Sequence, residues 1–146
     1  MPRLVHKVVP VVTRVRDSGI QLLVFNHPQE RQQIVKGTLE PEEDLEDAAL
    51  RELAEESGIT EAIITHQIGD LAFEHKGEHQ HWHFFKVEAQ VELPERWEYY
   101  ADEDGGMWFK LFWQDIDQPL DTPWPEVFDR SRLFIREWLT ATEEDS

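Results

Sequence analysis

The 146-residue sequence contains no cysteine. Disulfide bonds, thiolate zinc sites and cysteine nucleophiles are therefore excluded, and the absence of cysteine agrees with a cytoplasmic location. No run approaches the roughly 18–20 apolar residues that a membrane-spanning helix needs. The apolar run near the N-terminus is short, contains His6, Lys7 and Pro10, and lacks the form of a signal peptide. We expect a soluble, cytoplasmic protein with no membrane partner.

Basic residues are scarce: 14 Lys and Arg stand against 31 Asp and Glu, which gives a net charge of −17. A long DNA or RNA would be repelled by this charge, so long nucleic acid is not an expected partner. A small anionic substrate remains compatible, provided that divalent cations bridge it to the protein's acids. Solubility alone is an equally good reason for the acidity.

The length predicts a single domain over residues 1–146, with an acidic tail from about 141 to 146 that is frayed. Hydrophobic periodicity and turn residues predict strands at 8–15, 20–26, 62–74, 80–91 and 107–112, helices at 42–57 and 125–140, and a loop at 93–106. Pro10 should mark a strand edge or start, and Gly58 should end the first helix. This order of elements indicates an α/β or α+β sandwich.

The helix predicted at 42–57 carries both a buried stripe and an acidic face. Glu52, Glu55 and Glu56 follow the i, i+3, i+4 spacing, so they share one side of the helix. Three like charges there destabilise the helix unless something neutralises them, and Mg²⁺ is commonly bound by such carboxylates together with phosphate oxygens. Arg51 is placed to orient one of the acids. The alternative is a solvated helix face, because Glu and Arg are good helix formers.

The full spacing from Gly37 to Ile59 resembles the signature of the Nudix hydrolase family. That signature is Gly, five residues, Glu, seven residues, Arg-Glu, an aliphatic residue, any residue, Glu-Glu, any residue, Gly and an aliphatic residue. Every fixed position is matched over these 23 residues, by Gly37, Glu43, Arg51, Glu52, Leu53, Glu55, Glu56, Gly58 and Ile59. Nine specified positions make a far more specific signal than a lone glycine motif.

The resemblance implies a Nudix-like α/β/α sandwich with a mixed sheet, and hydrolysis of a phosphoanhydride bond. The expected substrate is a nucleoside diphosphate linked to another moiety, such as a nucleoside triphosphate or a dinucleoside polyphosphate. Glu52, Glu55, Glu56 and the Gly37 carbonyl would bind Mg²⁺ or Mn²⁺, and Arg51 would hold the carboxylates in place. Dimers are common in the family, so a homodimer is a further possibility.

Three positions depart from what many relatives carry. Thr38 and Glu42 stand where glycines are frequent, and Val35 replaces the proline of the Pro-Lys-Gly sequence found in dinucleoside-polyphosphate hydrolases. None of the three is fixed in the signature, so they put subfamily and loop shape in question, not the metal site.

The general base is open between Glu52 and an acid from the later loop. The loop offers Glu98, Asp102, Glu103 and Asp104. We favour Glu103 among these, because it shortly precedes the strand that begins at Met107.

Substrate contacts are expected from side chains outside the signature. Lys36 and Arg31 flank Gly37 and are candidates for phosphate binding, while Tyr99 is a candidate for stacking on a nucleobase. Tyr99, with Trp97 and Tyr100, alternatively folds its loop onto the core.

His79, His81 and His83 alternate and would point to one face of a strand. This pattern has three interpretations: the histidines bind a transition metal, they contact the phosphate or the nucleobase of a substrate, or they form a polar sheet face. Of these residues, His81 is our candidate substrate contact.

Two other functions remain open at this level. One is a catalytically inactive nucleotide sensor with the Nudix fold, although a pure binder has no need to retain all three glutamates. The other is an unrelated enzyme that uses a metal bound by His79, His81 and His83.

Overall fold

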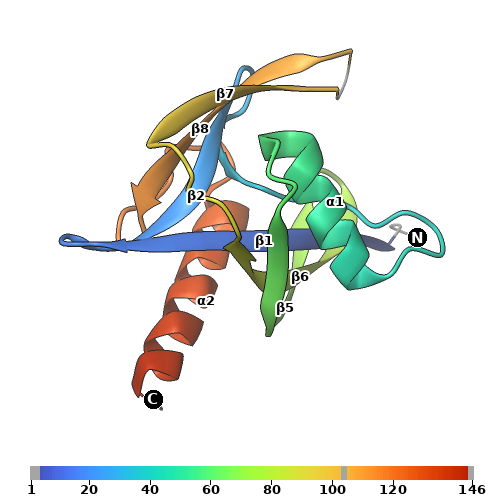
Figure 1. Ribbon diagram of the computed structural model, residues 1–146. Helices are drawn as coiled ribbons and strands as arrows, with labels where there is room; N and C mark the ends of the chain where they lie inside the picture. Colours follow the sequence, from blue (N-terminus) through green and yellow to red (C-terminus); the bar gives the residue numbers. More distant parts are fainter. Residues whose placement is uncertain (1–3, 103–104, 145–146) are drawn as a thin grey trace.

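The computed structural model describes residues 4–102 and 105–144, which form a mixed sheet between two helices (Figure 1). The sheet has the strand order β5-β6-β1-β2-β8-β7, with β3 paired to β2 and β4 paired to β1. The strands are β1 (Leu4–Arg16), β2 (Gly19–His27), β3 (Arg31–Ile34), β4 (Gly37–Thr38), β5 (Ala62–His75), β6 (Glu78–Ala89), β7 (Arg96–Ala101) and β8 (Met107–Asp115), and the helices are α1 (Leu45–Ser57) and α2 (Pro125–Glu144).

Strand β1 belongs to both halves of the sheet. It pairs in parallel with β6 along residues 4–12, and antiparallel with β4 at residues 7–8 and with β2 at residues 13–16. Pro10 is buried in the middle of β1, between the two antiparallel pairings and opposite Phe85 of β6. Of the two predicted positions, a strand start and a strand edge, the start is wrong: the proline occupies a stretch of β1 whose one edge β2 and β4 leave uncovered, where a missing N–H is tolerated.

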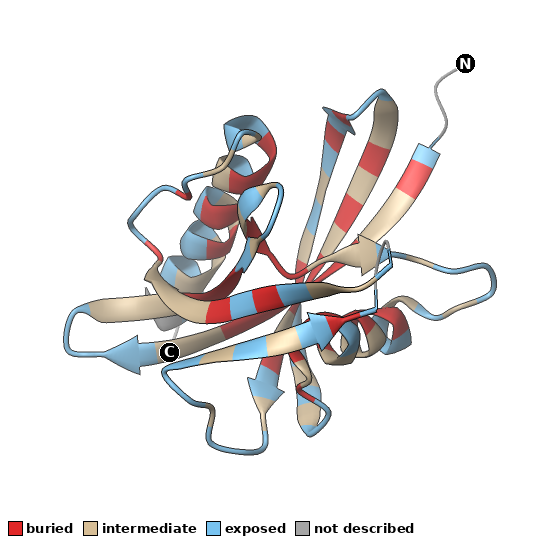
Figure 2. Ribbon diagram, turned by 90° about the horizontal axis from the view of Figure 1, so that it is seen from above, coloured by how far each residue is buried: buried red, intermediate tan, exposed pale blue. Residues whose placement is uncertain are grey.

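The two helices cover opposite faces of β1 and β6. Val8 and Phe85 pack with Ala48 and Ala49 of α1, whereas the other face of the same strands packs against α2. That second cluster includes Val9, Trp82, Phe84, Phe128 and Ile135. Figure 2 shows buried residues along one side of each helix and exposed residues along the other. The predicted α/β/α sandwich with a mixed sheet is confirmed.

Helix α1 begins later than predicted. Asp44 caps it, with its carboxylate accepting hydrogen bonds from the backbone N–H groups of Glu46 at 3.2 Å and Asp47 at 3.4 Å. Glu42 and Glu43 therefore lie in the preceding turn, not in the first helical turn. Gly58 ends the helix at φ 82°, and its N–H donates to the Ala54 carbonyl at 2.9 Å, as expected for a glycine at this position.

The segment predicted as a loop at 93–106 contains strand β7. Trp97 and Tyr99 alternate with polar residues and pack toward the α1 side, where they join the cluster around Leu53 and Phe109. Helix α2 continues to Glu144, so part of the tail predicted to fray is helical. No helix in the described ranges is long and apolar enough to cross a membrane.

Candidate active site

Arg51, on the middle of α1, gathers three carboxylates. Its Nε and Nη2 donate to the two oxygens of Glu43 at 2.6 and 2.9 Å, and its Nη1 donates to Glu52 at 2.7 Å and to Glu55 at 3.1 Å. Nη2 also reaches the Thr38 carbonyl at 3.1 Å. The hydrogen bonds to Glu43 raise the pKa of Arg51 and hold the pKa of Glu43 below its ordinary value. One guanidinium thus ties helix, capping turn and β4 together.

Gly37 lies directly against the carboxylate of Glu52. A Cβ at position 37 would stand 1.8 Å from the Glu52 Cδ and 2.0 and 2.3 Å from its oxygens, so no side chain fits here. Glu52 and Glu56 are 5% and 4% exposed. Glu56 accepts a hydrogen bond from the Lys36 backbone N–H at 3.1 Å, whereas the Glu55 side chain is half exposed.

These donors fit a hard divalent cation in kind. Glu52 and Glu56 are buried carboxylates, which are stable only when paired or bound to metal, and both lie against the backbone around Gly37. Carboxylate and carbonyl oxygens are the ligands that Mg²⁺ prefers. Arg51 sets the spacing between Glu52 and Glu55, because its Nη1 donates to both carboxylates.

A basic group lies next to the carboxylates. Lys7 of β1 donates to the Thr38 hydroxyl at 2.6 Å. Burial lowers the pKa of Lys7, and the charge of Lys36 lowers it further, while Glu52 opposes the shift. Lys36 extends over the rings of Trp82 and Phe128, with its Nζ 5.9 and 5.8 Å from their centroids.

His75 and Lys76 extend this basic group. Burial lowers the pKa of His75, and the charges of Lys76 and Lys36 lower it further. Lys76 donates to Glu30 at 2.7 Å. Glu30 pairs with Lys76 and Glu78 acts on Lys7, so Lys36 and Lys7 are the positive charges of this group that are left to stabilise an anion near Glu52.

A sequence model of the NUDIX domain matches residues 5–134. The chain belongs to the NUDIX family. The resemblance found in residues 37–59 is thereby confirmed, and the family supports a hydrolase that acts on phosphorus-containing anhydrides.

Solved Nudix structures share the fold of the whole chain. An Ap4A hydrolase from C. elegans is 20% identical with a TM-score of 0.66, covering 95% of this chain and 98% of that one. The NUDIX domain of NrtR from Shewanella oneidensis, in complex with ADP ribose, is 16% identical with a TM-score of 0.63, covering 95% and 89%. A MutT protein from Methanosarcina mazei is 16% identical with a TM-score of 0.62, covering 97% and 96%. No curated protein matches the sequence.

The other residues predicted for this Nudix site lie apart from the Arg51 network. Arg31 forms an exposed ion pair with Asp121 at 3.1 Å. The ring of Tyr99 covers Gly58 at the end of α1, and His81 is hydrogen-bonded to Asp70. Their roles in substrate binding stay predictions.

Two of the four loop acids proposed as alternative general bases lie within the described residues. Glu98 and Asp102 are exposed, while Glu103 and Asp104 lie outside the described residues. The choice between Glu52 and Glu103 as general base therefore stays a prediction.

Sequence reasoning missed Lys7, His75 and His6 as site residues. Lys7 interrupts a long run of β-branched residues, and a charged side chain inside such a strand was an available signal. His75 ends β5, which pairs with β6, and β6 pairs with β1, which carries Lys7; no local pattern specifies the β1–β6 pairing.

Proposed function

We propose that this chain is a divalent-metal-dependent pyrophosphohydrolase that cleaves a phosphoanhydride bond in a nucleoside diphosphate linked to another moiety. The observation that carries the proposal is the Arg51 network, which holds Glu43, Glu52 and Glu55 together, with Glu52 against the Gly37 backbone. A helix face used only for solubility has no need to bury Glu52 and Glu56 against β4.

Mg²⁺ or Mn²⁺ would be held by Glu52, Glu55, Glu56 and the Gly37 carbonyl. When bound, such an ion neutralises the diphosphate and lowers the pKa of the attacking water. Arg51 acts as a positioning residue, because its contacts fix Glu52 and Glu55 relative to each other. Glu43 holds Arg51 in turn.

Glu52 is our first candidate to accept the proton of the attacking water, since its carboxylate is buried at the centre of the network. Glu103 is the second. The reaction splits one phosphorus–oxygen bond of the anhydride and adds water across it, which gives two phosphorylated products. Positioning and charge stabilisation supply most of the rate enhancement in this chemistry.

The basic group of Lys7, Lys36, His75 and Lys76 would bind the substrate's phosphate chain. Lysine ammonium groups donate strong hydrogen bonds to phosphate oxygens, and Lys7 of this group lies near Glu52. A nucleoside triphosphate or a dinucleoside polyphosphate suits it best, because both carry a long phosphate chain. Ap4A and ADP ribose, named for two of the similar structures, are both nucleotides of the proposed chemical class. Arg31, His81 and Tyr99 remain candidates for contacts to the rest of the substrate.

A nucleotide sensor is the second candidate function, and the ADP-ribose complex of a NUDIX domain provides a reason to test it. A sensor would bind the nucleotide without turnover. The retention of all three glutamates of the signature in this chain favours the hydrolase.

The test is hydrolysis of a nucleotide panel with Mg²⁺ or Mn²⁺, followed as phosphate released by a coupled phosphatase. The Glu56→Gln variant is compared with Glu46→Gln, an exposed glutamate on the same helix. We expect turnover by the wild type and by Glu46→Gln, and a loss of at least about 100-fold in Glu56→Gln. Equal activity of the two variants, or tight nucleotide binding with no turnover by the wild type, would refute the proposed function.

A further inference from the structure

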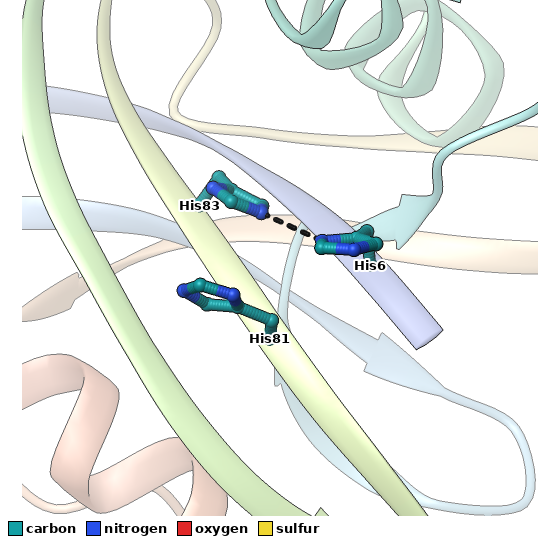
Figure 3. Close-up of side chains that lie close together, drawn as sticks. All are labelled: His6, His81 and His83. Carbon is teal, nitrogen blue, oxygen red and sulfur yellow. Dashed lines mark hydrogen bonds between the residues drawn. The ribbon is translucent and has the colours of Figure 1, made fainter. Parts of the chain in front are cut away.

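Three histidines form a cluster on the α1 side of the sheet. His6 comes from β1 and His81 and His83 come from β6, and the parallel register places His6 opposite His81 and Val8 opposite His83. All three are half-buried, and Figure 3 shows the rings of His6 and His83 directed toward each other, with the His81 ring beside them. The Nudix chemistry described above uses none of these rings as a metal ligand.

The nitrogens have the spacing of metal ligands. One nitrogen of each ring lies within 4.8 Å of the other two, and this is the only such group of three histidines or acids among residues 4–102 and 105–144. His6 Nδ1 and His83 Nε2 are 3.1 Å apart. Two nitrogens bound at 2.0–2.1 Å to a tetrahedral Zn²⁺ stand about 3.3 Å apart. The rings of His81 and His83 are stacked with centroids 4.4 Å apart, so these side chains must turn before all three nitrogens face one ion.

A carboxylate from the neighbouring strand holds one of the rings. Nε2 of His81 is hydrogen-bonded to Asp70 of β5, so the other nitrogen, Nδ1, is the one available for a metal. Histidines that bind zinc commonly make this second contact, which fixes the ring orientation and the position of its proton. A polar sheet face alone does not require such an arrangement.

The charge state of His83 also suits a ligand. Burial lowers its pKa, and the neighbouring His81 and His6 lower it further, which favours the neutral ring. Neutral imidazole is the form that binds metal.

We propose that His6, His81 and His83 form a second metal site, selective for a transition-metal dication such as Zn²⁺. Imidazole suits zinc, cobalt and nickel, whereas carboxylate oxygens suit magnesium, so the two sites differ in their ions. Three protein ligands leave a fourth position for water. The ion would cross-link β1 and β6 at residues up to 77 positions apart in sequence.

His79 does not belong to this site, contrary to the set of three alternating histidines considered from the sequence. Its Nδ1 lies 3.3 Å from Glu74 Oε1. His6, on the adjacent strand, takes its place. His79 is therefore a matched control on the same strand.

The test is a titration of the full chain with Co²⁺ and Zn²⁺ in excess Mg²⁺, which saturates an oxygen-ligand site and competes weakly for imidazole. Cobalt in a four-coordinate nitrogen site absorbs strongly in the visible range, whereas six-coordinate cobalt bound by oxygens absorbs weakly. We expect one equivalent with strong absorption, its displacement by Zn²⁺, and a rise in Tm with Zn²⁺. Absence of the strong band overturns the proposal.

Variants then locate the bound ion. His6→Gln and His83→Gln should each weaken binding by more than the roughly 10- to 100-fold expected for Asp70→Asn, whose side chain acts through His81. His79→Gln and Glu56→Gln should retain the band. Circular dichroism without metal checks that each variant is folded. If one of the two histidine variants does not fold, the other one alone provides the test. Unchanged affinity in a folded His6→Gln or His83→Gln variant, or an equal loss in His79→Gln, overturns the site.

Discussion

Arg51 donates two hydrogen bonds to Glu43, from Nε at 2.6 Å and from Nη2 at 2.9 Å, and thereby holds α1 against the turn that precedes it. The fork uses two of the five N–H donors of the guanidinium, and the remaining donors reach Glu52, Glu55 and the Thr38 carbonyl. A lysine offers one point charge in place of this geometry.

Arg51→Lys should therefore lower kcat by about 100-fold while KM changes little, because the carboxylates lose their alignment but keep a nearby charge. Steady-state kinetics with the substrate found in the panel measure both constants. Arg136→Lys, in an exposed ion pair with Asp117, is the control and should match the wild type. A kcat within a factor of three of wild type for Arg51→Lys would show that the network does not position the reacting groups.

Gly37→Ala should abolish most of the activity, because the new Cβ would overlap the Glu52 carboxylate. We expect a loss on the order of 100-fold in kcat/KM from displacement of Glu52. Gly19→Ala, where nothing lies within 4 Å of the added Cβ, changes only turn strain at the far end of β1. If both alanine variants retain full activity, the close approach of Gly37 to Glu52 has no catalytic role.

Lys7→Met and Lys36→Met should each raise KM by about 10- to 100-fold, the loss expected for one charged hydrogen bond to phosphate. Lys110→Met is the matched control on β8. Lys110 lines a groove of about 510 Å³ together with Trp97 and Glu98. A higher KM for Lys110→Met alone would place the phosphate chain in that groove and contradict the proposed basic group.

The ion pair of Glu43 with Arg51 predicts a loss of stability in acid. The pKa of Glu43 in the folded chain is held below its ordinary value of 4.5 by the Arg51 hydrogen bonds. Its contribution is therefore complete above pH 4.5 and disappears as pH falls through the lower, folded value. Urea unfolding of the wild type and Glu43→Gln should give a difference in unfolding free energy that shrinks below pH 4.5. A difference that is independent of pH would contradict this.

Gly58→Ala should destabilise the chain through two separate effects. Gly58 has φ 82°, and a Cβ there would stand 2.7 Å from the Tyr99 ring. Gly77 has φ 75° but open space around it, so Gly77→Ala measures the backbone effect alone. We expect about 1 kcal/mol for Gly77→Ala and about 1–3 kcal/mol more for Gly58→Ala from the overlap with Tyr99. Equal values from urea unfolding would show that the Tyr99 contact is negligible.

The parts of the fold that follow from short-range sequence patterns were predicted. Helix α1, its end at Gly58 and the signature residues depend on spacings within 23 residues, and those spacings are visible in the chain. The start of α1 was placed too early because an acidic run fits the first helical turn as well as the capping turn. Only the preference of Asp44 for the cap separates the two.

The long-range pairings were not predictable, since no local pattern specifies which strands become neighbours. The parallel pairing of β1 with β6 places His6 beside His81 and so creates the histidine cluster. Strand β7 was missed because Pro94 and the glycines at 105–106 dominate its segment. The alternation of Trp97 and Tyr99 with polar residues was the available strand signal.

The membership of β1 in both halves of the sheet has a consequence for how the chain folds. β1 is synthesised long before β6. The two strands pair only after His83 has been added, 77 positions after His6. Closing so large a loop is slow, and proteins dominated by distant contacts fold slowly. During synthesis, β1 and β2 can form their hairpin at once, while the β6 edge of β1 stays uncovered. That edge is rich in valine, which makes the nascent chain prone to aggregation until β6 arrives.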